Sequence, residues 1–521
     1  MRMLGDNFRS LTLGIPFANP REDQLKGDFM QATTAGRIRL ISSEPKIRVL
    51  HLTWLAFFVS FIVWFNHAPL MASIRTTFGL TDQQVSALLI LNVALTIPAR
   101  ILVGMLVDKV GPRLMYAILL AISGALCLMF AFAQSFAMLA LSRFLLGFVG
   151  AGFVVGIRMV AEWFPAKETG VAQGVYAGFG NFGSAAAAVT LPTLAMYFGG
   201  DDGWRWAVAT TGVIAIVYAL IYFLAVSDTP KGSTYFSPKK TGAMEVTSKG
   251  DFLLYVLMQA PLYLALAVLA WKLGPANLKM LSPEMTFVAY AVLATIYLHG
   301  VWDTWRINKA IFSTPVAEIH RYKFRQVAAL NFAYFATFGS ELAVVSILPL
   351  FFKDTFGLSL TAAGFLGASF GMTTFFARPL GGLLSDRFGR KTVLLWCLAG
   401  TAAGYLAMSQ MGPNLGLVYA VCSTFVCSLF VNAGNGAVYA MLPMIKRRLT
   451  GQIAGIVGAY GNVGGVLFLT AYSFLSAQSF FMLAGVMAII SLIMVLALIE
   501  EPQGQITEVM PDGSVAMIDV T

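Results

Sequence analysis

The chain has 521 residues, of which 58% are hydrophobic and only 12% charged, and its formal net charge is +10. Soluble domains carry about 25% charged residues, so the composition excludes an ordinary soluble protein and predicts a polytopic membrane protein. The apolar runs are continuous rather than alternating and about 20 residues long, the length that a membrane-spanning helix needs. They therefore predict an all-α protein and exclude a β-barrel.

The predicted elements begin after a polar tail, residues 1–49, which lacks the pattern of a cleaved signal peptide. The first half, residues 50–227, contains six predicted spans: 50–72, 83–107, 113–134, 136–163, 168–198 and 204–227. A central linker, residues 228–325, holds two further apolar segments, 251–273 and 284–304, which either cross the bilayer or lie as a hairpin in its interface. The second half, residues 326–499, contains spans 326–352, 360–385, 391–410, 413–444, 449–475 and 478–499, and an acidic tail, residues 500–521, follows.

Basic residues are concentrated in alternate loops between the predicted helices. Because cytoplasmic loops carry an excess of Lys and Arg, this pattern predicts a multi-pass protein of the plasma (cytoplasmic) membrane with both termini in the cytoplasm. The positive charge then orients the chain in the lipid bilayer, and no nucleic-acid partner is expected. The residues are Lys109, Arg113, Lys231, Lys239, Lys240, Arg321, Lys323, Arg325, Arg387, Arg390, Lys391, Lys446, Arg447 and Arg448.

Motifs that carry enzymatic chemistry are missing from the sequence. The four cysteines lie in apolar runs without the spacing of metal ligands. No nucleophile–base set and no nucleotide-binding loop is found. We therefore expect no disulfide framework, no metal, no cofactor and no enzymatic activity.

The two halves of the chain repeat each other. Arg100, Gly104 and Asp108 recur at one constant spacing as Arg378, Gly382 and Asp386. A second set, around Gly180-Asn181, recurs around Gly461-Asn462. Internal repeats of this kind place a substrate site near the middle of the bilayer between two halves that rock against each other. The repeat predicts two pseudo-symmetric halves of six helices each.

Arg100 and Arg378 lie inside apolar segments, in equivalent positions of the repeat. A cation at bilayer depth costs about 2.5–3.5 kcal/mol on insertion scales, so such residues are normally functional. The apolar part of each segment contains no carboxylate that would neutralise its own arginine. Two unpaired guanidiniums that face one cavity would form a binding site for an anion.

A duplicated loop motif follows each arginine. Gly104-x-x-x-Asp108-x-x-Gly111-x-Arg113 recurs as Gly382-x-x-x-Asp386-x-x-Gly389-Arg390, and both resemble the loop motif of the major facilitator superfamily. We expect Asp108, Arg113, Asp386 and Arg390 to close the cytoplasmic side in one state. A purely structural turn with topogenic charges is the alternative.

Glycine-rich segments surround Asn181 and Asn462. Gly180 and Gly461 allow close helix contact and are expected to take part in gating. Asn181 would present amide donors where an unsatisfied amide is costly. The alternative is that these glycine faces and their asparagines only hold helices together.

These duplicated motifs, together with Tyr334-x-x-Thr337-Phe338-Gly339-Ser340, resemble the nitrate/nitrite porter family of the major facilitator superfamily. Arg158-Met-Val-Ala-Glu-Trp-Phe-Pro165 and Phe338-Gly-Ser-Glu-Leu-Ala343 resemble the cyanobacterial-type nitrate permeases in particular. The resemblance covers residues 50–500 and implies the major facilitator fold. It implies that the substrate-binding residues are Arg100, Arg378, Asn181, Tyr334, Phe338, Phe153 and Asn462. Two departures are Glu341, where some members have an uncharged residue, and the central pair of apolar segments, which the shortest members lack.

The resemblance implies a secondary active transporter that takes up nitrate and nitrite by alternating access, and we expect it to act as a monomer. Inward movement of an anion against the membrane potential costs about 2.3 kcal/mol per 100 mV, which favours proton symport. Glu341 is the candidate proton carrier, and an ion pair that braces one arginine is its alternative role. The alternative functions are nitrate/nitrite exchange, transport of another small anion, and nitrate sensing without net transport.

Overall fold

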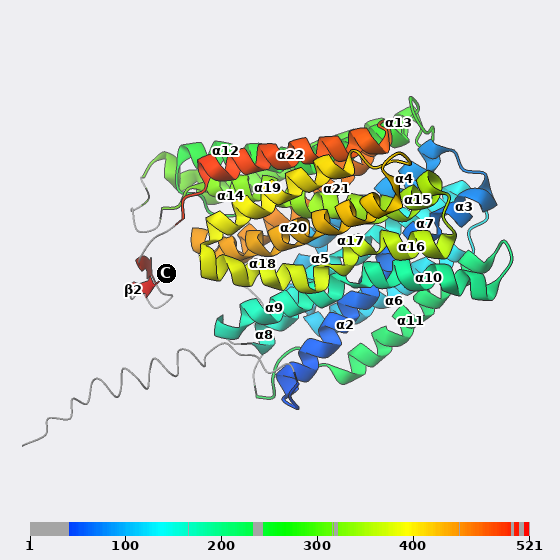
Figure 1. Ribbon diagram of the computed structural model, residues 1–521. Coiled ribbons are helices and arrows are strands. Elements are labelled where there is room, and N and C mark those ends of the chain that lie inside the picture. The colour runs from blue at the N-terminus through cyan, green and yellow to red at the C-terminus, as the bar shows by residue number, and fades with distance from the viewer. Residues whose placement is uncertain are drawn as a thin grey trace, which may run out of the picture.

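The computed structural model describes residues 41–164, 166–232, 243–314, 316, 321–446, 449–501, 505–509 and 515–519. Helices dominate it and run roughly side by side in one long bundle (Figure 1). The first half consists of α2 (Pro45–Phe65), η1 (Ala68–Leu70), α3 (Met71–Phe78), α4 (Asp82–Ala94), α5 (Thr96–Val110), α6 (Pro112–Ala131), α7 (Phe136–Leu146), η2 (Gly147–Ala151), α8 (Gly152–Trp163), α9 (Ala166–Asn181), α10 (Gly183–Phe198) and α11 (Gly203–Ala225).

The central linker contributes α12 (Lys249–Leu273), α13 (Pro283–Asn308) and η3 (Lys309–Phe312). The second half consists of α14 (Phe324–Tyr334), η5 (Phe335–Gly339), α15 (Ser340–Phe356), α16 (Leu360–Gly367), α17 (Ser369–Met372), α18 (Thr374–Phe388), α19 (Arg390–Met408), α20 (Gly416–Ile445), α21 (Thr450–Tyr472) and α22 (Ala477–Leu498). Near the end of the chain, β1 (Gln505–Val509) and β2 (Val515–Asp519) pair as an antiparallel hairpin, which the sequence analysis did not predict.

Helix ends are set by capping residues and by glycines. Thr81 and Gln84 form a reciprocal capping box at the start of α4, and Ser248 accepts a hydrogen bond from Asp251 at the start of α12. Gly111 and Gly389 end α5 and α18 with φ of 90° and 91°. L-residues with a side chain rarely adopt this conformation, which explains why the duplicated loop motif contains a glycine at this position.

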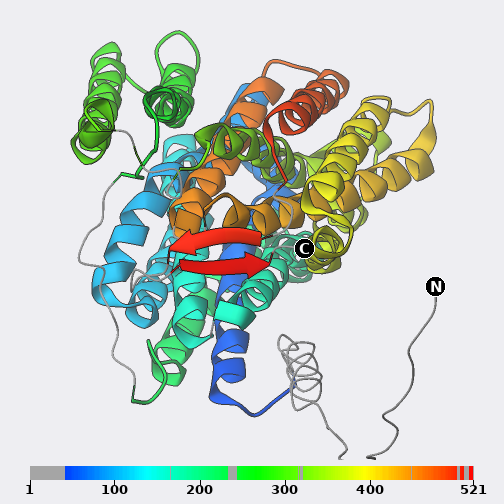
Figure 2. The same ribbon diagram turned by 90° about the vertical axis from the view of Figure 1, so that its left-hand side faces the viewer.

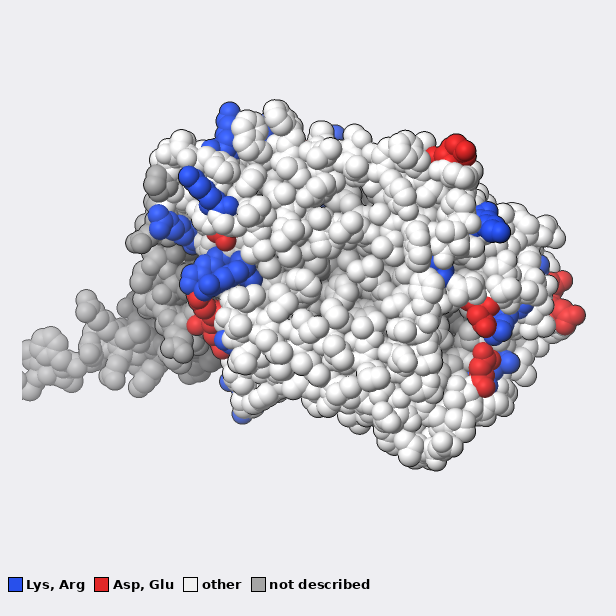
Figure 3. All heavy atoms as spheres, turned by 90° about the horizontal axis from the view of Figure 1, so that it is seen from above, with Lys and Arg blue, Asp and Glu red and all other residues white. Residues whose placement is uncertain are grey.

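Among the described residues, thirteen helical stretches are long and apolar enough to cross a membrane. Figure 3 shows Lys, Arg, Asp and Glu gathered at the two ends of the bundle, with a broad uncharged zone between them. We call the end that carries Arg113, Lys323 and Arg390 the basic end. The fold prediction is confirmed: the protein is a helical, multi-pass membrane protein.

The central helices α12 and α13 lie outside the two halves, as the view along the bundle shows (Figure 2). Both are among the stretches long enough to span a membrane, and they run in roughly the same direction as the other long helices (Figure 1). The Tyr460 hydroxyl of α21 donates to the Met258 carbonyl of α12 at 2.7 Å. The Lys272 amine of α12 donates to Gln83 of α4. Both helices thus have the length for a span and α12 packs against the bundle; that the pair crosses the bilayer stays a prediction.

Several spans of the two halves are interrupted. The fourth changes to a 3₁₀ turn at Gly147–Ala151, and α9 ends at Asn181 before α10 begins. The span of α14 and α15, called the seventh because α12 and α13 are not counted, contains a π-helical turn at Phe335–Gly339. Such breaks free backbone carbonyls from the regular helix pattern and are tolerated at membrane depth where they lie within protein or line a cavity. All three breaks contain or adjoin residues of the site described next.

At the end opposite to the basic end, the two halves are joined directly. Arg75 of α3 pairs with Asp354 of α15 at 3.6 Å. The Gln83 side chain of α4 donates to the Ser473 carbonyl after α21 at 3.0 Å. The structure is therefore closed between the halves at this end.

Candidate functional site

Arg100 of α5 and Arg378 of α18 meet at one aromatic ring, although they belong to different halves. Their side chains are almost fully buried, with residue exposures of 8% and 7%. The guanidinium carbons lie 5.9 Å and 5.2 Å from the centroid of Phe338, in the π-helical turn of the seventh span. The structure thus brings the two duplicated arginines together, as the repeat predicts.

Arg100 is held by backbone carbonyls rather than by a carboxylate. Its Nε donates to the Gly150 carbonyl at 3.3 Å, and its Nη1 donates to the Gly458 carbonyl at 3.1 Å. The Phe153 ring lies 5.1 Å from the guanidinium carbon. Gly150 and Gly458 belong to opposite halves, so Arg100 contacts both. Carbonyl acceptors orient the guanidinium and leave its charge uncompensated.

Arg378 differs, because a carboxylate pairs with it. Its Nη2 donates to Oε2 of Glu341 at 2.7 Å, and both side chains are buried. The expectation of two unpaired guanidiniums is therefore wrong for Arg378. The carboxylate comes from α15 in the seventh span, not from the apolar segment that contains the arginine. The ion pair is the alternative role that the sequence left open for Glu341.

Glu341 is surrounded by polar groups from two other helices, α18 and α20. Asn435 of α20 donates to its Oε2 at 2.7 Å, and Thr374 of α18 donates to its Oε1 at 3.4 Å. Thr374 also donates to Asn432 at 2.8 Å. The two guanidiniums and this carboxylate together leave one net positive charge at the centre of the protein.

Asn181 lies directly against Arg378. With its amide turned so that Oδ1 faces the guanidinium, it accepts hydrogen bonds from Nη1 and, at 3.0 Å, from Nη2. Since the opposite orientation presents the amide NH₂, the same side chain can accept from the arginine or donate to an anion. The end of α9 at Asn181 positions this amide at the boundary of the two halves.

Aromatic rings line the central site. Tyr334 and Phe338 stack with centroids 5.0 Å apart and an interplanar angle of 12°. A Cβ on Gly461 would lie 2.6 Å from Phe338 and 2.8 Å from Tyr334, so glycine is required for α21 to pack against this pair. On the other half, a Cβ on Gly180 would lie 2.1 Å from the Phe57 ring.

Asn462 is linked to Arg100 through a shared backbone acceptor. Its amide donates to the Gly458 carbonyl at 2.9 Å, the same oxygen that accepts from Arg100. Among the described contacts it therefore supports a partner of Arg100 rather than facing either guanidinium. Its role as a binding residue stays a prediction.

The described contacts of the residues in the duplicated loop motif are made to groups of the same half. Arg390 pairs with Asp386 at 2.9 Å, and its backbone N–H donates to Glu501 after α22. In the first half, the Arg113 backbone N–H donates to Asp228 after α11 at 2.7 Å. The side chain of Asp108 lies outside the described residues. The expected gating role of these residues is untested by these contacts.

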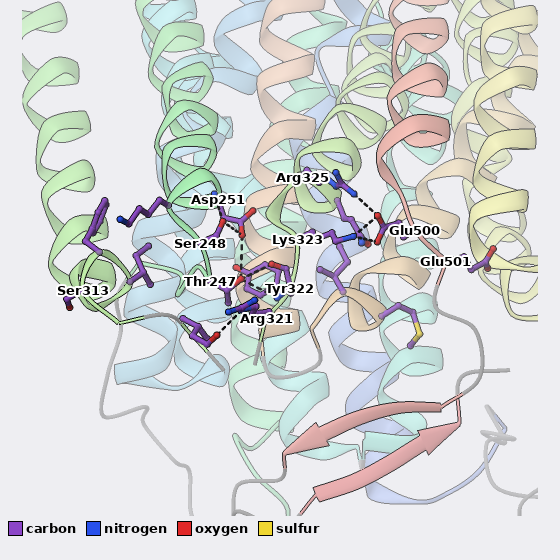
Figure 4. Close-up of a pocket in the computed structure, with 17 residues that line it drawn as sticks. Thr247, Ser248, Asp251, Ser313, Arg321, Tyr322, Lys323, Arg325, Glu500 and Glu501 are labelled. Carbon is purple, nitrogen blue, oxygen red and sulfur yellow. Dashed lines mark hydrogen bonds and ion pairs between the residues drawn. The ribbon is translucent and has the colours of Figure 1, made fainter. Parts of the chain in front are cut away.

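Polar groups at the site that the sequence did not reveal include Asn435 and Thr374 beside Glu341, and the carbonyls of Gly150 and Gly458. Asn435 stands in a Gly434-Asn435-Gly436 run that could have indicated it, because glycines also flank the duplicated asparagines. Separately, a cavity of about 1040 Å³ opens at the basic end among Thr247, Tyr322, Lys323 and Glu500 (Figure 4). Its lining contains neither arginine of the central site.

Two helical halves that meet around buried arginines define a membrane transporter, and the chain belongs to the Major Facilitator Superfamily, whose sequence profile matches residues 53–311 and 330–513. Within that superfamily it belongs to the nitrate/nitrite porter family. It is 43% identical over 510 residues to the nitrate/nitrite transporter NrtP of Picosynechococcus sp., across 90% of this chain and 95% of that protein. It is also 43% identical over 475 residues to NrtP of Nostoc punctiforme, across 89% and 95%.

A solved structure shows the same fold. The xylose transporter XylE from E. coli, in a partially occluded inward open conformation, matches with a TM-score of 0.57 and 14% identity, across 88% of this chain and 100% of that one. At this identity the match shows the fold alone. The family and the fold expected from the sequence are confirmed.

Proposed function

We propose that this protein takes up nitrate and nitrite by alternating access, with protons as the coupling ion. The observation that carries the proposal is the buried centre between the halves, where Arg100 and Arg378 flank Phe338 and Glu341 balances one of their charges. The NrtP relatives, which are nitrate/nitrite transporters, support the choice of substrate.

The charge of the centre favours a monovalent anion. While Glu341 is ionised, one bound nitrate or nitrite neutralises the single net positive charge, whereas a dianion would leave a buried negative charge, which is costly. Guanidinium is planar and carries a fork of donors that suits the planar oxyanion. Aromatic faces such as Phe338 can lie against the anion without competing for its hydrogen bonds.

Binding between the halves couples the anion to their movement. The anion would bridge Arg100 of the first half and Arg378 of the second, and so reduce the repulsion between the two guanidiniums. This attraction favours closure around the occupied site. We place the basic end in the cytoplasm because of its Lys- and Arg-rich loops, so the closed end described above faces the outside.

Glu341 provides a route for proton coupling. An anion that binds Arg378 competes with the Glu341 carboxylate for the same guanidinium, and like charges repel. Protonation of Glu341 removes that competition, so proton and anion favour each other's binding, and this coupling is reciprocal. Asn435 and Thr374 can still hydrogen-bond the neutral acid.

Reconstitution tests the proposal. Purified protein in liposomes is expected to accumulate nitrate and nitrite, and more so when the outside is acidic. A one-unit pH gradient is equivalent to about 1.4 kcal/mol, or about tenfold in accumulation, for each proton carried. Uptake that requires internal nitrite and ignores the pH gradient would show an exchanger, and absence of any nitrate movement would refute transport.

Glu341→Gln separates coupling from binding. The variant should lose stimulation by the pH gradient and keep nitrate/nitrite exchange, because the amide can no longer take up a proton. Glu284→Gln, at the exposed start of α13, is the matched control and should keep full stimulation. Proton coupling that survives in Glu341→Gln would remove Glu341 from the mechanism.

A further inference from the structure

Tyr439 of α20 lies beside Arg100, at a place that the sequence analysis did not single out. The two side chains meet over Gly458 of α21. A Cβ added to this glycine would lie 3.3 Å from the Tyr439 hydroxyl and 3.4 Å from Nη1 of Arg100. Tyr439 thus presents its polar end to the arginine that no described carboxylate neutralises.

The ring of Tyr439 is fixed by aromatic neighbours from both halves. Tyr334 packs edge-on against it with centroids 5.2 Å apart, and Phe153 does so at 6.2 Å. Phe153 also covers the guanidinium of Arg100. The position of the hydroxyl therefore follows from packing and needs no hydrogen bond to maintain it.

The Tyr439 hydroxyl is buried and makes no hydrogen bond of regular geometry among the described residues, although the Tyr334 side chain lies close to it. Three other buried tyrosines have acceptors: Tyr176 donates to Gly152 at 2.8 Å, Tyr405 to Ser340 at 2.7 Å, and Tyr460 to Met258 at 2.7 Å. A buried hydroxyl without an acceptor is costly and calls for an explanation. An acceptor supplied by a ligand beside Arg100 is that explanation.

We infer that Tyr439 is a further substrate-binding residue, whose hydroxyl donates a hydrogen bond to a bound small oxyanion beside Arg100. The inference rests on the proposed function. Nitrate has three oxygen acceptors, and two can be taken by the guanidinium forks, so the hydroxyl serves the third. Nitrite has only two oxygens, so Tyr439 favours nitrate over nitrite.

Tyr439→Phe tests this inference, because it removes the hydroxyl and keeps the ring. A hydrogen bond to a charged partner is strong enough that its loss should raise the KM for nitrate about tenfold or more, with a smaller rise for nitrite. Tyr460→Phe, which also removes one buried tyrosine hydroxyl but lies away from the arginines, is the control and should keep the wild-type KM for both anions. An unchanged KM for nitrate in Tyr439→Phe would overturn the inference, and an equal rise for both anions would overturn the assignment to the third oxygen.

Two further measurements keep the test decisive. Nitrate should raise the Tm of purified wild-type protein and of Tyr460→Phe more than that of Tyr439→Phe, which reports binding without transport. Gly458→Ala inserts a methyl group between hydroxyl and guanidinium and should also raise the KM for nitrate, whereas Gly455→Ala, where a Cβ meets open space, should not. Wild-type protein that moves no nitrate would refute the proposed function, whereas normal wild-type uptake with an unaltered Tyr439→Phe would refute only this inference.

Discussion

Arg100 and Arg378 are predicted to be irreplaceable even by lysine. Lysine keeps the charge but loses the planar fork, and at position 100 it cannot reach the Gly150 and Gly458 carbonyls with the geometry that Nε and Nη1 provide. Because each hydrogen bond to a charged group contributes about 1.5–3 kcal/mol, kcat/KM for nitrate should fall roughly 100-fold or more in Arg100→Lys or Arg378→Lys. Uptake assays in liposomes check this, with Arg306→Lys on the exposed face of α13 as the control. Near-normal uptake by either lysine variant would contradict the fork model.

At the same scale, the sequence predicted which arginines are functional but not how they are paired. Arg100 and Arg378 stand out because a cation inside an apolar run is rare and costly. Their partners come from other helices: Glu341 from α15, and the Gly458 carbonyl from α21. Such contacts depend on how helices are rotated against each other, which the spacing within one segment does not contain. The same reason explains why Tyr439 was missed.

At the scale of helices, α21 is predicted to require glycine at position 461 but not at position 455, six residues earlier. A Cβ at Gly461 would press on Phe338 and Tyr334, whereas a Cβ at Gly455 meets nothing within 4 Å. Gly461→Ala should therefore displace the stacked pair, reduce nitrate uptake at least about tenfold and lower the Tm, since overpacking typically costs about 1–3 kcal/mol. Gly455→Ala is the matched control for helix propensity and should behave as wild type. Equal effects of the two substitutions would show that the contact with the aromatic pair is unimportant.

The spans were predictable because each is a long apolar run, which needs no knowledge of its neighbours. The irregular turns inside the spans were not predictable in this way. Residues 335–339 form a π-helical turn and residues 147–151 a 3₁₀ turn, yet both stretches continue the apolar pattern of their helices. Tertiary packing against the arginines decides these turns. The central pair was left open for a related reason: composition alone does not distinguish a span from an interfacial helix, and the contacts of Tyr460 and Lys272 show only that α12 packs against α21 and α4.

At the scale of the whole molecule, the residues after the last helix fasten the second half at the basic end. Glu500 accepts hydrogen bonds from Lys323 at 2.7 Å and from Arg325 at 2.5 Å, at the start of α14 (Figure 4). Glu501 accepts from the backbone N–H groups of Arg390 and Lys391 at the start of α19. These two carboxylates join the end of α22 to two other helices of the same half.

This connection gives a pH dependence whose sign is fixed by the charges. Hydrogen bonds from Lys323 and Arg325 lower the pKa of Glu500 below its ordinary value, so its stabilising effect is complete above that ordinary value, about 4.3, and is lost as the pH falls through the lowered pKa. Glu500→Gln should therefore lower the Tm at about pH 7 by at most a few degrees, because the pair is half exposed. The difference from wild type should shrink in high salt and disappear once the pH falls below the lowered pKa of Glu500, as thermal unfolding of purified protein can show. Asp201→Asn at the opposite end is the control, and a Tm difference that persists unchanged in acid would mean that the charge of Glu500 is not what holds the helices together.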